Sequence, residues 1–99
     1  MKFNVQAIGF KADQKLIELI EKKVQKLTHF FDKVINVEVF LKLDNNSSQR
    51  KEKIAEVKLS LPGNQLFAAG SSKLFEESVD IAVDNVKRQL KRHKERLRG

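Results

Sequence analysis

The chain has 99 residues, enough for one domain with a single core and too few for two. It contains no cysteine, which excludes disulfides and thiolate metal sites. Its formal net charge of +7 and isoelectric point near 9.8 favour a nucleic acid or another anionic partner. The first residues lack the apolar segment of a signal peptide, and the longest apolar run is far shorter than the ~20 residues of a membrane span. We therefore expect a cytoplasmic protein with no membrane partner.

The N-terminal part predicts a strand and then a helix. Residues 2–9 alternate between polar and apolar side chains, which is typical of a strand. From about Asp13, a residue type favoured at helix N-caps, the period becomes helical. The apolar stripe of this helix consists of Leu16, Ile17, Ile20, Val24, Leu27 and Phe31. A second stripe is basic and consists of Lys15, Lys22, Lys26 and His29.

Three more strands are predicted in the middle of the chain. Residues 34–43 alternate again, and their apolar side chains are Ile35, Val37, Val39, Leu41 and Leu43. Residues 45–48 indicate a hairpin tip. Residues 53–61 form the next predicted strand, with inward side chains Ala55, Val57, Leu59 and Leu61. Residues 62–64 predict a tight turn, and residues 65–69 a short strand whose buried face is ambiguous.

A final helix completes the predicted fold. Its expected N-cap is Ser71 or Ser72, and its apolar face consists of Phe75, Val79, Ala82, Val83, Val86 and Leu90. The element order is β-α-β-β-β-α, in which the first three elements form a βαβ unit with parallel strands. We expect an α+β fold: a two-layer sandwich with a four-stranded mixed sheet and both helices on one face, similar to a double-stranded-RNA-binding domain. Residues 1–99 then form a single domain.

The final helix continues beyond its apolar face as a strongly basic segment. Residues 87–98 contain seven cations and one acid. Matching the helix macrodipole is worth ~0.3–1 kcal/mol and involves only the last turn, whereas these cations extend over about three turns. Because both helices are expected on one sheet face, their outer basic sides should adjoin. This predicts a phosphate-binding surface, with folded RNA as the natural partner. We expect its end, residues 87–99, to be partly disordered.

Two other groups of polar residues have simpler interpretations. His29 and His93 lie on different helices without the spacing of metal ligands, and we expect both at the surface. Acids at i, i+4 spacing form a ladder on the final helix: Glu76, Asp80 and Asp84. Such a ladder could bind a metal, but it more often pairs with neighbouring cations, here Lys73, Lys87 and Arg88. We expect no metal and no cofactor.

Catalysis has no support in the sequence. The serines at 47, 48, 71 and 72 have no base arranged beside them. Gly63 and Gly70 are expected in turns, and no phosphate-cradling glycine loop is present. Seven phenylalanines without Tyr or Trp indicate core positions, apart from Phe40, whose phase places it on the open side of the sheet. We expect a protein that is not an enzyme.

Several segments along the chain together resemble a known family. These are Glu-Lys-Lys-Val-Gln-Lys-Leu at 21–27, Lys-Ile-Ala-Glu-Val at 53–57 before Pro62-Gly63, and Val79-Asp80 before Lys-Arg-Gln-Leu-Lys-Arg at 87–92. In this order and spacing they resemble the ribosome hibernation promoting factors, also called ribosome-associated inhibitors or sigma-54 modulation proteins. The chain looks like a short form of the family, without the further domain that joins two ribosomes in long members.

The resemblance implies a function. Such a protein sits in the small ribosomal subunit between head and body, contacts 16S rRNA and nearby ribosomal proteins, overlaps the path of messenger and transfer RNA, and inhibits translation under stress or in stationary phase. It implies a monomer with no small-molecule substrate. Carried over to this sequence, the rRNA-binding residues are Lys22, Lys23, Lys26, Arg88, Lys91, Arg92 and Lys94.

Other classes of protein fit parts of the pattern. A double-stranded-RNA-binding module also combines a sheet with two helices and would bind free RNA duplexes. A transcription modulator would act on a sigma factor through protein contacts. An enzyme of the acylphosphatase type fits least well, because such folds usually end with a strand after the second helix.

Overall fold

The structure is a computed structural model that describes residues 2–45 and 51–98. Its elements in chain order are β1 (Lys2–Ile8), α1 (Gln14–Phe30), β2 (Asn36–Asn45), β3 (Lys51–Leu61), β4 (Asn64–Ser72) and α2 (Phe75–Arg98). The predicted order and the α+β class are confirmed. The fourth strand is longer than predicted. The predicted hairpin tip lies outside the described residues except for Asn45, the last residue of β2.

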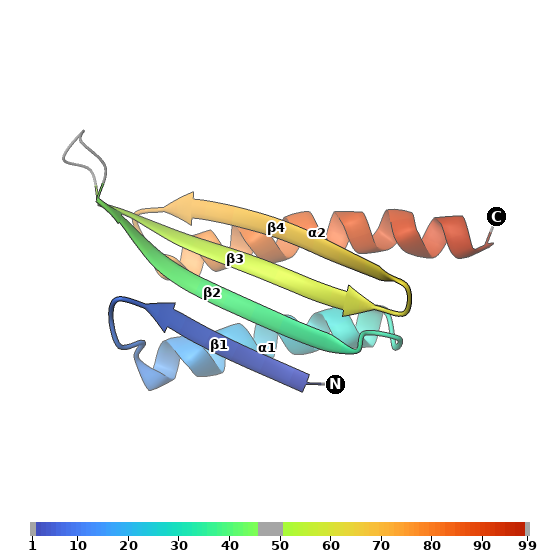
Figure 1. The fold of residues 1–99 in the computed structure, drawn as a ribbon, viewed down its shortest axis with the longest axis horizontal. Helices are drawn as coiled ribbons and strands as arrows, with labels where there is room; N and C mark the ends of the chain where they lie inside the picture. Colours follow the sequence, from blue (N-terminus) through green and yellow to red (C-terminus); the bar gives the residue numbers. More distant parts are fainter. Residues whose placement is uncertain (1, 46–50, 99) are drawn as a thin grey trace.

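The four strands form one mixed sheet in the order β1-β2-β3-β4. β1 pairs with β2 in parallel, so α1 crosses between two neighbouring parallel strands. β2 pairs with β3, and β3 with β4, in antiparallel register. Both helices cover the same face of this sheet, and among the described residues no helix lies on its other face (Figure 1). The predicted two-layer arrangement is confirmed.

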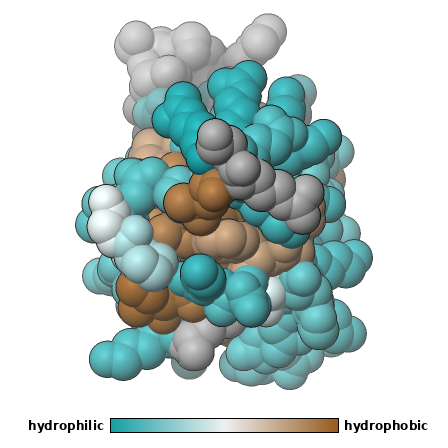
Figure 2. Space-filling view, turned by 90° about the vertical axis from the view of Figure 1, so that its right-hand side faces the viewer, coloured by the Kyte–Doolittle hydropathy of each residue, from teal (hydrophilic) through white to brown (hydrophobic). Residues whose placement is uncertain are grey.

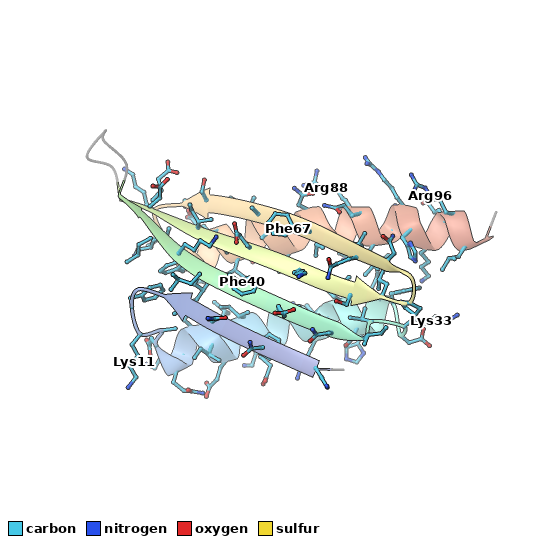
Figure 3. The ribbon with its side chains drawn as sticks, viewed as in Figure 1. Lys11, Lys33, Phe40, Phe67, Arg88 and Arg96 are labelled. Carbon is cyan, nitrogen blue, oxygen red and sulfur yellow. The ribbon has the colours of Figure 1, made fainter. Side chains whose placement is uncertain are left out.

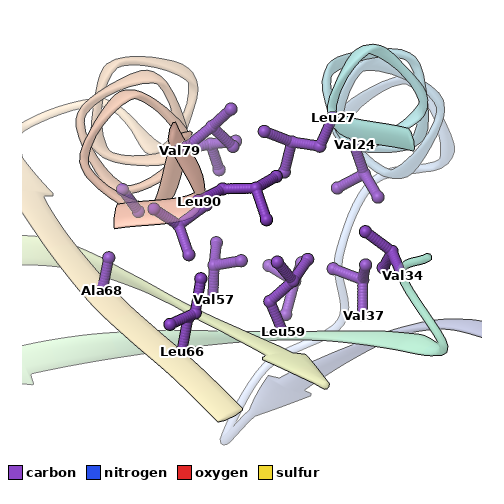
Figure 4. Packing of buried hydrophobic residues seen from close by; sticks show 14 of the residues in the cluster. Val24, Leu27, Val34, Val37, Val57, Leu59, Leu66, Ala68, Val79 and Leu90 are labelled. Carbon is purple, nitrogen blue, oxygen red and sulfur yellow. The ribbon is translucent and has the colours of Figure 1, made fainter. Parts of the chain in front are cut away.

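The core lies between the helix pair and the sheet (Figure 4). The strands contribute the buried side chains of Val37, Val39, Leu41, Ala55, Val57, Leu59, Leu61, Leu66 and Ala68. The helices contribute Ile20, Val24, Leu27, Val79, Ala82, Val83, Val86 and Leu90. These include most of the apolar faces predicted from the two periodicities. The sequence left open which face of β4 is buried. In the structure Leu66 and Ala68 are buried and Phe67 is exposed.

The two ends of the predicted second strand depart from expectation. Ile35 is 53% exposed and Leu43 is 41% exposed, although both have the phase of the buried residues. The chain before Asn36 is not yet strand, so Val34 is buried in place of Ile35. Leu43 lies towards the far end of β2, where the β2–β3 ribbon extends beyond the helices (Figure 1). Periodicity predicts which face of the sheet a side chain lies on, but it does not predict how far along the strand the helices cover that face.

The expectation that the phenylalanines fill the core is wrong for most of them. Among the described core residues only Phe31 is a buried phenylalanine, and Val, Leu, Ile and Ala make up the rest. Phe40 is half-buried and Phe67 is exposed, and both lie on the helix-free face of the sheet (Figure 3). Aliphatic side chains fill the space between the helices and the sheet, so most phenylalanine rings pack at the edge of the core. Four of them are partly buried there: Phe3, Phe10, Phe30 and Phe75.

The helix ends follow the predicted caps only in part. Asp13 is the N-cap of α1, and its carboxylate accepts a hydrogen bond from the Lys15 N–H, as predicted. At α2 the first helical bond runs from the Ser78 N–H to the Leu74 carbonyl, so neither predicted serine is the N-cap. Ser72 instead ends β4 and its hydroxyl lies 2.5 Å from a Glu77 carboxylate oxygen. α2 is helical through Arg98; partial disorder over 87–99 stays a prediction.

Candidate nucleic-acid interface

The facing sides of α1 and α2 are joined by an ion pair. Lys23 on α1 contacts the carboxylate of Asp80 on α2, and their side chains are 22% and 52% exposed. The prediction that the acids of the ladder pair with Lys73, Lys87 and Arg88 is therefore wrong for Asp80, because packing two helices on one sheet face brings Lys23 closer. Part of the Lys23 charge is already balanced within the protein.

A groove between the helices continues from this ion pair. It has a volume of about 240 Å³ and is lined by Lys23, Lys26, Leu27, Asp80, Val83, Asp84 and Lys87. Lys23, Lys26 and Leu27 occupy positions i, i+3 and i+4, the spacing of one helix face. Cations from both helices therefore meet across the groove, and Lys26 is the member of the predicted basic stripe that lines it.

A larger cleft opens beside the last residue of α1. It has a volume of about 540 Å³ and is lined by Phe30, Asp84, Lys87, Arg88 and Lys91. A smaller cleft of about 180 Å³ adjoins the same aromatic ring and is lined by Phe30, Lys91, Lys94 and Glu95. We call the set Phe30, Asp84, Lys87, Arg88 and Lys91 the Phe30 cleft. It combines an aromatic ring, one carboxylate and three cations.

Two lysines of α2 lie close to the ring of Phe30. The Lys94 Nζ is 4.8 Å from the ring centroid and donates a hydrogen bond to the Phe30 carbonyl oxygen at 3.2 Å. The Lys87 Nζ is 5.6 Å from the same centroid. Lys94 is half-buried, whereas Lys87 is exposed. Lys94 therefore ties the end of α1 to α2, while Lys87 keeps its charge available to a ligand.

The remaining cations of α2 belong to another side of the helix. Arg92 and Arg96 line a groove of about 180 Å³ together with Asn64, Leu66, Gln89 and His93. This groove lies beside β4 rather than beside α1. Arg88 and Arg96 extend outward from α2 (Figure 3). The basic segment thus presents charge over a broad arc of α2, from the side facing α1 to the side facing β4.

The predicted site residues fall into three places. Lys26, Arg88 and Lys91 line the adjoining groove and Phe30 cleft, and Lys94 borders the smaller cleft beside them. Lys22 is exposed one turn before Lys26, and Arg92 lies on the β4 side of α2. All seven predicted residues are on the helix layer, and among the described residues Lys23 is the one of them that forms an ion pair.

Two residues of this surface, Lys87 and Phe30, are absent from the predicted set. Lys87 lines both the interhelical groove and the Phe30 cleft, yet on the final helix the predicted rRNA-binding residues begin at Arg88. The predicted apolar stripe of the first helix includes Phe31, which is buried at the C-cap of α1, but not Phe30. A signal for Phe30 exists: it lies seven residues after Lys23 and three after Leu27, on the helix face that meets α2.

The two histidines have different environments. His29 is exposed, as predicted. His93 is half-buried, with its ring edge-on to Phe31 at a centroid distance of 5.9 Å and its Nδ1 3.4 Å from the Asn64 amide nitrogen. The surface position predicted for His93 therefore holds in part: its ring packs against Phe31 at the end of α1, and it also lines the groove of Arg92 and Arg96.

The helix-free face of the sheet has a different chemistry. Its charged residues are of both signs, and Lys42 pairs with Glu56 across β2 and β3 at 2.9 Å. The opposite, helix-covered layer carries the clefts lined by three or more cations. Seen from the right-hand side of Figure 1, where α2 ends, an apolar area is bordered by hydrophilic side chains (Figure 2). Among the described residues, the clefts lined by several cations therefore lie on the helix layer.

Over residues 2–45 and 51–98, no cluster of three or more His, Cys, Asp or Glu side chains has a geometry that could hold a metal ion. Within the same residues, neither helix combines the length and apolarity needed to cross a membrane.

Comparison with known proteins identifies one family. The sequence model described as "Sigma 54 modulation protein / S30EA ribosomal protein" matches residues 3–98. A ribosome hibernation promoting factor of Pseudomonas putida is 27% identical over 96 residues, which are 97% of this chain and 89% of that protein. A ribosome hibernation promoting factor of Klebsiella oxytoca is 24% identical over 98 residues, covering 99% of this chain and 98% of that protein.

Solved structures share the fold. A ribosomal subunit interface protein from Coxiella burnetii superposes with a TM-score of 0.84 at 23% identity, covering 95% of this chain and 98% of that one. The N-terminal domain of Protein Y from Thermus thermophilus gives a TM-score of 0.78 at 22% identity, covering 94% and 99%. At these identities the likeness establishes the architecture.

Proposed function

We propose that this chain, which belongs to the sigma 54 modulation protein / S30EA ribosomal protein family, is a ribosome hibernation factor. It binds the small ribosomal subunit through 16S rRNA and neighbouring ribosomal proteins, in the path of messenger and transfer RNA. There it keeps the ribosome inactive during stress or stationary phase. It works in the cytoplasm, as a monomer.

One observation carries this proposal beyond the family membership: cations from two helices gather on one layer of the molecule. Lys26 on α1 and Lys87 on α2 line the same groove, and Arg88 and Lys91 extend this surface into the Phe30 cleft. Such an arrangement can follow several phosphates of folded RNA at once. Phosphate neutralisation releases counterions, which provides much of the affinity and makes it depend on salt.

The proposed mechanism is occupancy rather than catalysis. A protein that blocks the messenger and transfer RNA path inhibits only while it is bound, so it must act stoichiometrically. Titration into a purified translation system should reduce protein synthesis in proportion to the amount added, with a floor near one copy per ribosome. Excess messenger and initiation components should restore synthesis, because reversible binding obeys mass action. Inhibition far below one copy per ribosome, or cleaved rRNA after incubation, would contradict this mechanism.

The partner is tested by sedimentation. Lysate from starved cells is separated on a sucrose gradient, and the protein is located by immunoblotting. We expect it in the fractions of the small subunit and of whole ribosomes, and we expect raised salt to move it to the top. A protein that stays with RNA polymerase would instead support a transcription modulator. Nanomolar binding to free RNA duplexes at physiological salt, without ribosome association, would support a double-stranded-RNA-binding module.

A further inference from the structure

The Phe30 cleft has a composition that its position on a phosphate-binding surface does not require. Neutralising phosphates needs cations alone, yet this cleft also contains an aromatic ring and the Asp84 carboxylate. Its volume of about 540 Å³ lies within the range of small-ligand sites. An aromatic face beside cations is the combination that proteins use to hold unpaired bases of single-stranded RNA.

We propose that the Phe30 cleft holds one unpaired nucleotide of the bound RNA strand. The base stacks on the Phe30 ring, Lys87, Arg88 and Lys91 contact the flanking phosphates, and Asp84 accepts a hydrogen bond from a base amino group or a ribose hydroxyl. This inference rests on the proposed binding of RNA and adds a nucleotide site to it.

The energetics allow a base to replace a lysine at the ring. An exposed cation–π contact is worth ~0.5–1 kcal/mol, whereas stacking of a base on an aromatic side chain is worth ~1–3 kcal/mol. Lys87 is exposed and lies 5.6 Å from the ring centroid, so it can turn from the ring to a phosphate. Lys94 is held by its bond to the Phe30 carbonyl oxygen and stays in place.

The ring itself is held in position for stacking. Phe30 is the last residue of α1, is half-buried and packs against the core. Phe31, the next residue, is buried and anchors the chain where the helix ends. A base therefore meets a ring that is already ordered, which lowers the entropic cost of binding.

The absence of tryptophan from the sequence provides a direct test. A Phe30→Trp variant carries the only tryptophan of the chain at the cleft. The matched control, Phe67→Trp, carries it on the helix-free face, where Phe67 is 53% exposed. Both are titrated with a single-stranded RNA oligomer. We expect stacking to quench the fluorescence of Trp at position 30 and to leave that at position 67 unchanged. Unchanged fluorescence at position 30 with saturating RNA overturns the proposal.

A second variant measures the contribution of the ring. Phe30→Leu keeps an apolar side chain against the core but removes the aromatic face, and thermal unfolding verifies that it folds. We expect its affinity for the same oligomer to fall about five-fold or more, as expected for one lost stack, and Phe67→Leu to bind as wild type does. Wild-type affinity for Phe30→Leu overturns the proposal.

Two further measurements distinguish a nucleotide of a bound strand from a free nucleotide, and failure of the nucleotide site from failure of the proposed function. A free mononucleotide should quench Trp at position 30 only at far higher concentration than the oligomer does. Equal potency would assign the cleft to free nucleotides and overturn the strand proposal. If Phe30→Leu sediments with ribosomes as wild type does and Trp at position 30 shows no quenching, the nucleotide site is wrong and ribosome binding stands. If the wild-type protein does not sediment with ribosomes, the proposed function fails whatever the oligomer shows.

Discussion

Gly70 on β4 lies directly against the backbone of α2 at Ser78. A methyl group on Gly70 would come within 2.3 Å of the Ser78 carbonyl oxygen and 2.8 Å of the Ile81 Cβ. The prediction that Gly70 lies in a turn is wrong, because it lies inside β4, paired with Ala55. The absence of a side chain sets how closely α2 approaches the sheet, and the helix carries most of the predicted RNA-binding cations.

Replacing Gly70 by Ala should therefore destabilise the fold. The added methyl meets helix backbone, which cannot move aside as a flexible side chain would, so we expect a loss of ~1–3 kcal/mol in the free energy of unfolding. Urea denaturation followed by circular dichroism measures it. The control is Ala69→Ser, at an exposed position of the same strand, where we expect a change within ~0.5 kcal/mol. Equal stability of Gly70→Ala and wild type would contradict the close packing described.

Core packing and RNA binding should respond to different residues of α2. Val79 is fully buried, and Val79→Ala removes two carbon atoms from the core. We expect a loss of roughly 1–3 kcal/mol in the free energy of unfolding, with unchanged RNA affinity at a temperature where the variant is folded. Ile81→Ala is the control, since Ile81 is 46% exposed on the same helix, and it should change stability by less. A larger loss for Ile81→Ala would contradict the assigned core face.

The exposed cations of α2 should show the opposite behaviour. Replacing Arg88, Lys91 and Arg92 together by Ala should leave stability nearly unchanged, with ~0.5 kcal/mol or less at each site, and should sharply weaken ribosome association. If each cation contacts a phosphate, the slope of log affinity against log salt should fall by about two to three units.

A charge-matched control separates local contacts from net charge in this experiment. Lys2, Lys11 and Lys73 are exposed and lie outside the clefts of the helix layer. Their triple replacement by Ala removes the same charge and should weaken binding much less. Equal losses for the two triple variants would mean that binding follows net charge. Unfolding of the α2 variant would mean that its cations are structural.

Asp80 should oppose RNA binding. Its carboxylate neutralises Lys23 at the edge of the interhelical groove, so Asp80→Asn should release a cation and remove a repulsive charge. We expect RNA affinity to rise and stability to fall by less than ~1 kcal/mol, because the ion pair is partly exposed. Titration of each protein into a fluorescently labelled RNA oligomer at fixed salt measures the affinity. Glu38→Gln, which makes the same charge change on the helix-free face, should have a smaller effect. Weaker binding by Asp80→Asn would show that the ion pair positions Lys23 for RNA.

Local patterns in the sequence determined most of the architecture. The alternation around Val39 and Val57 defines two strands with one buried face, and the stripes through Val24 and Val86 define two helices with one apolar side each. With the element order, these patterns were sufficient for the two-layer fold. The excess of cations in residues 87–98 was likewise enough to predict a surface for an anionic partner. All of these features depend on residues close together in the chain, so their periodicity can be recognised in the sequence alone.

Tertiary packing decided how the surface is arranged. Lys23 and Asp80 are 57 positions apart, and only the approach of α1 to α2 makes them partners. The same approach brings Phe30 beside Lys87 and Lys94, while Gly70 sets the depth at which α2 lies on the sheet. Which cations are free, which are paired and which surround an aromatic ring depends on contacts between distant segments. Helical periodicity predicts the direction of each side chain from its own axis, but the distance between two axes depends on the side chains packed between them.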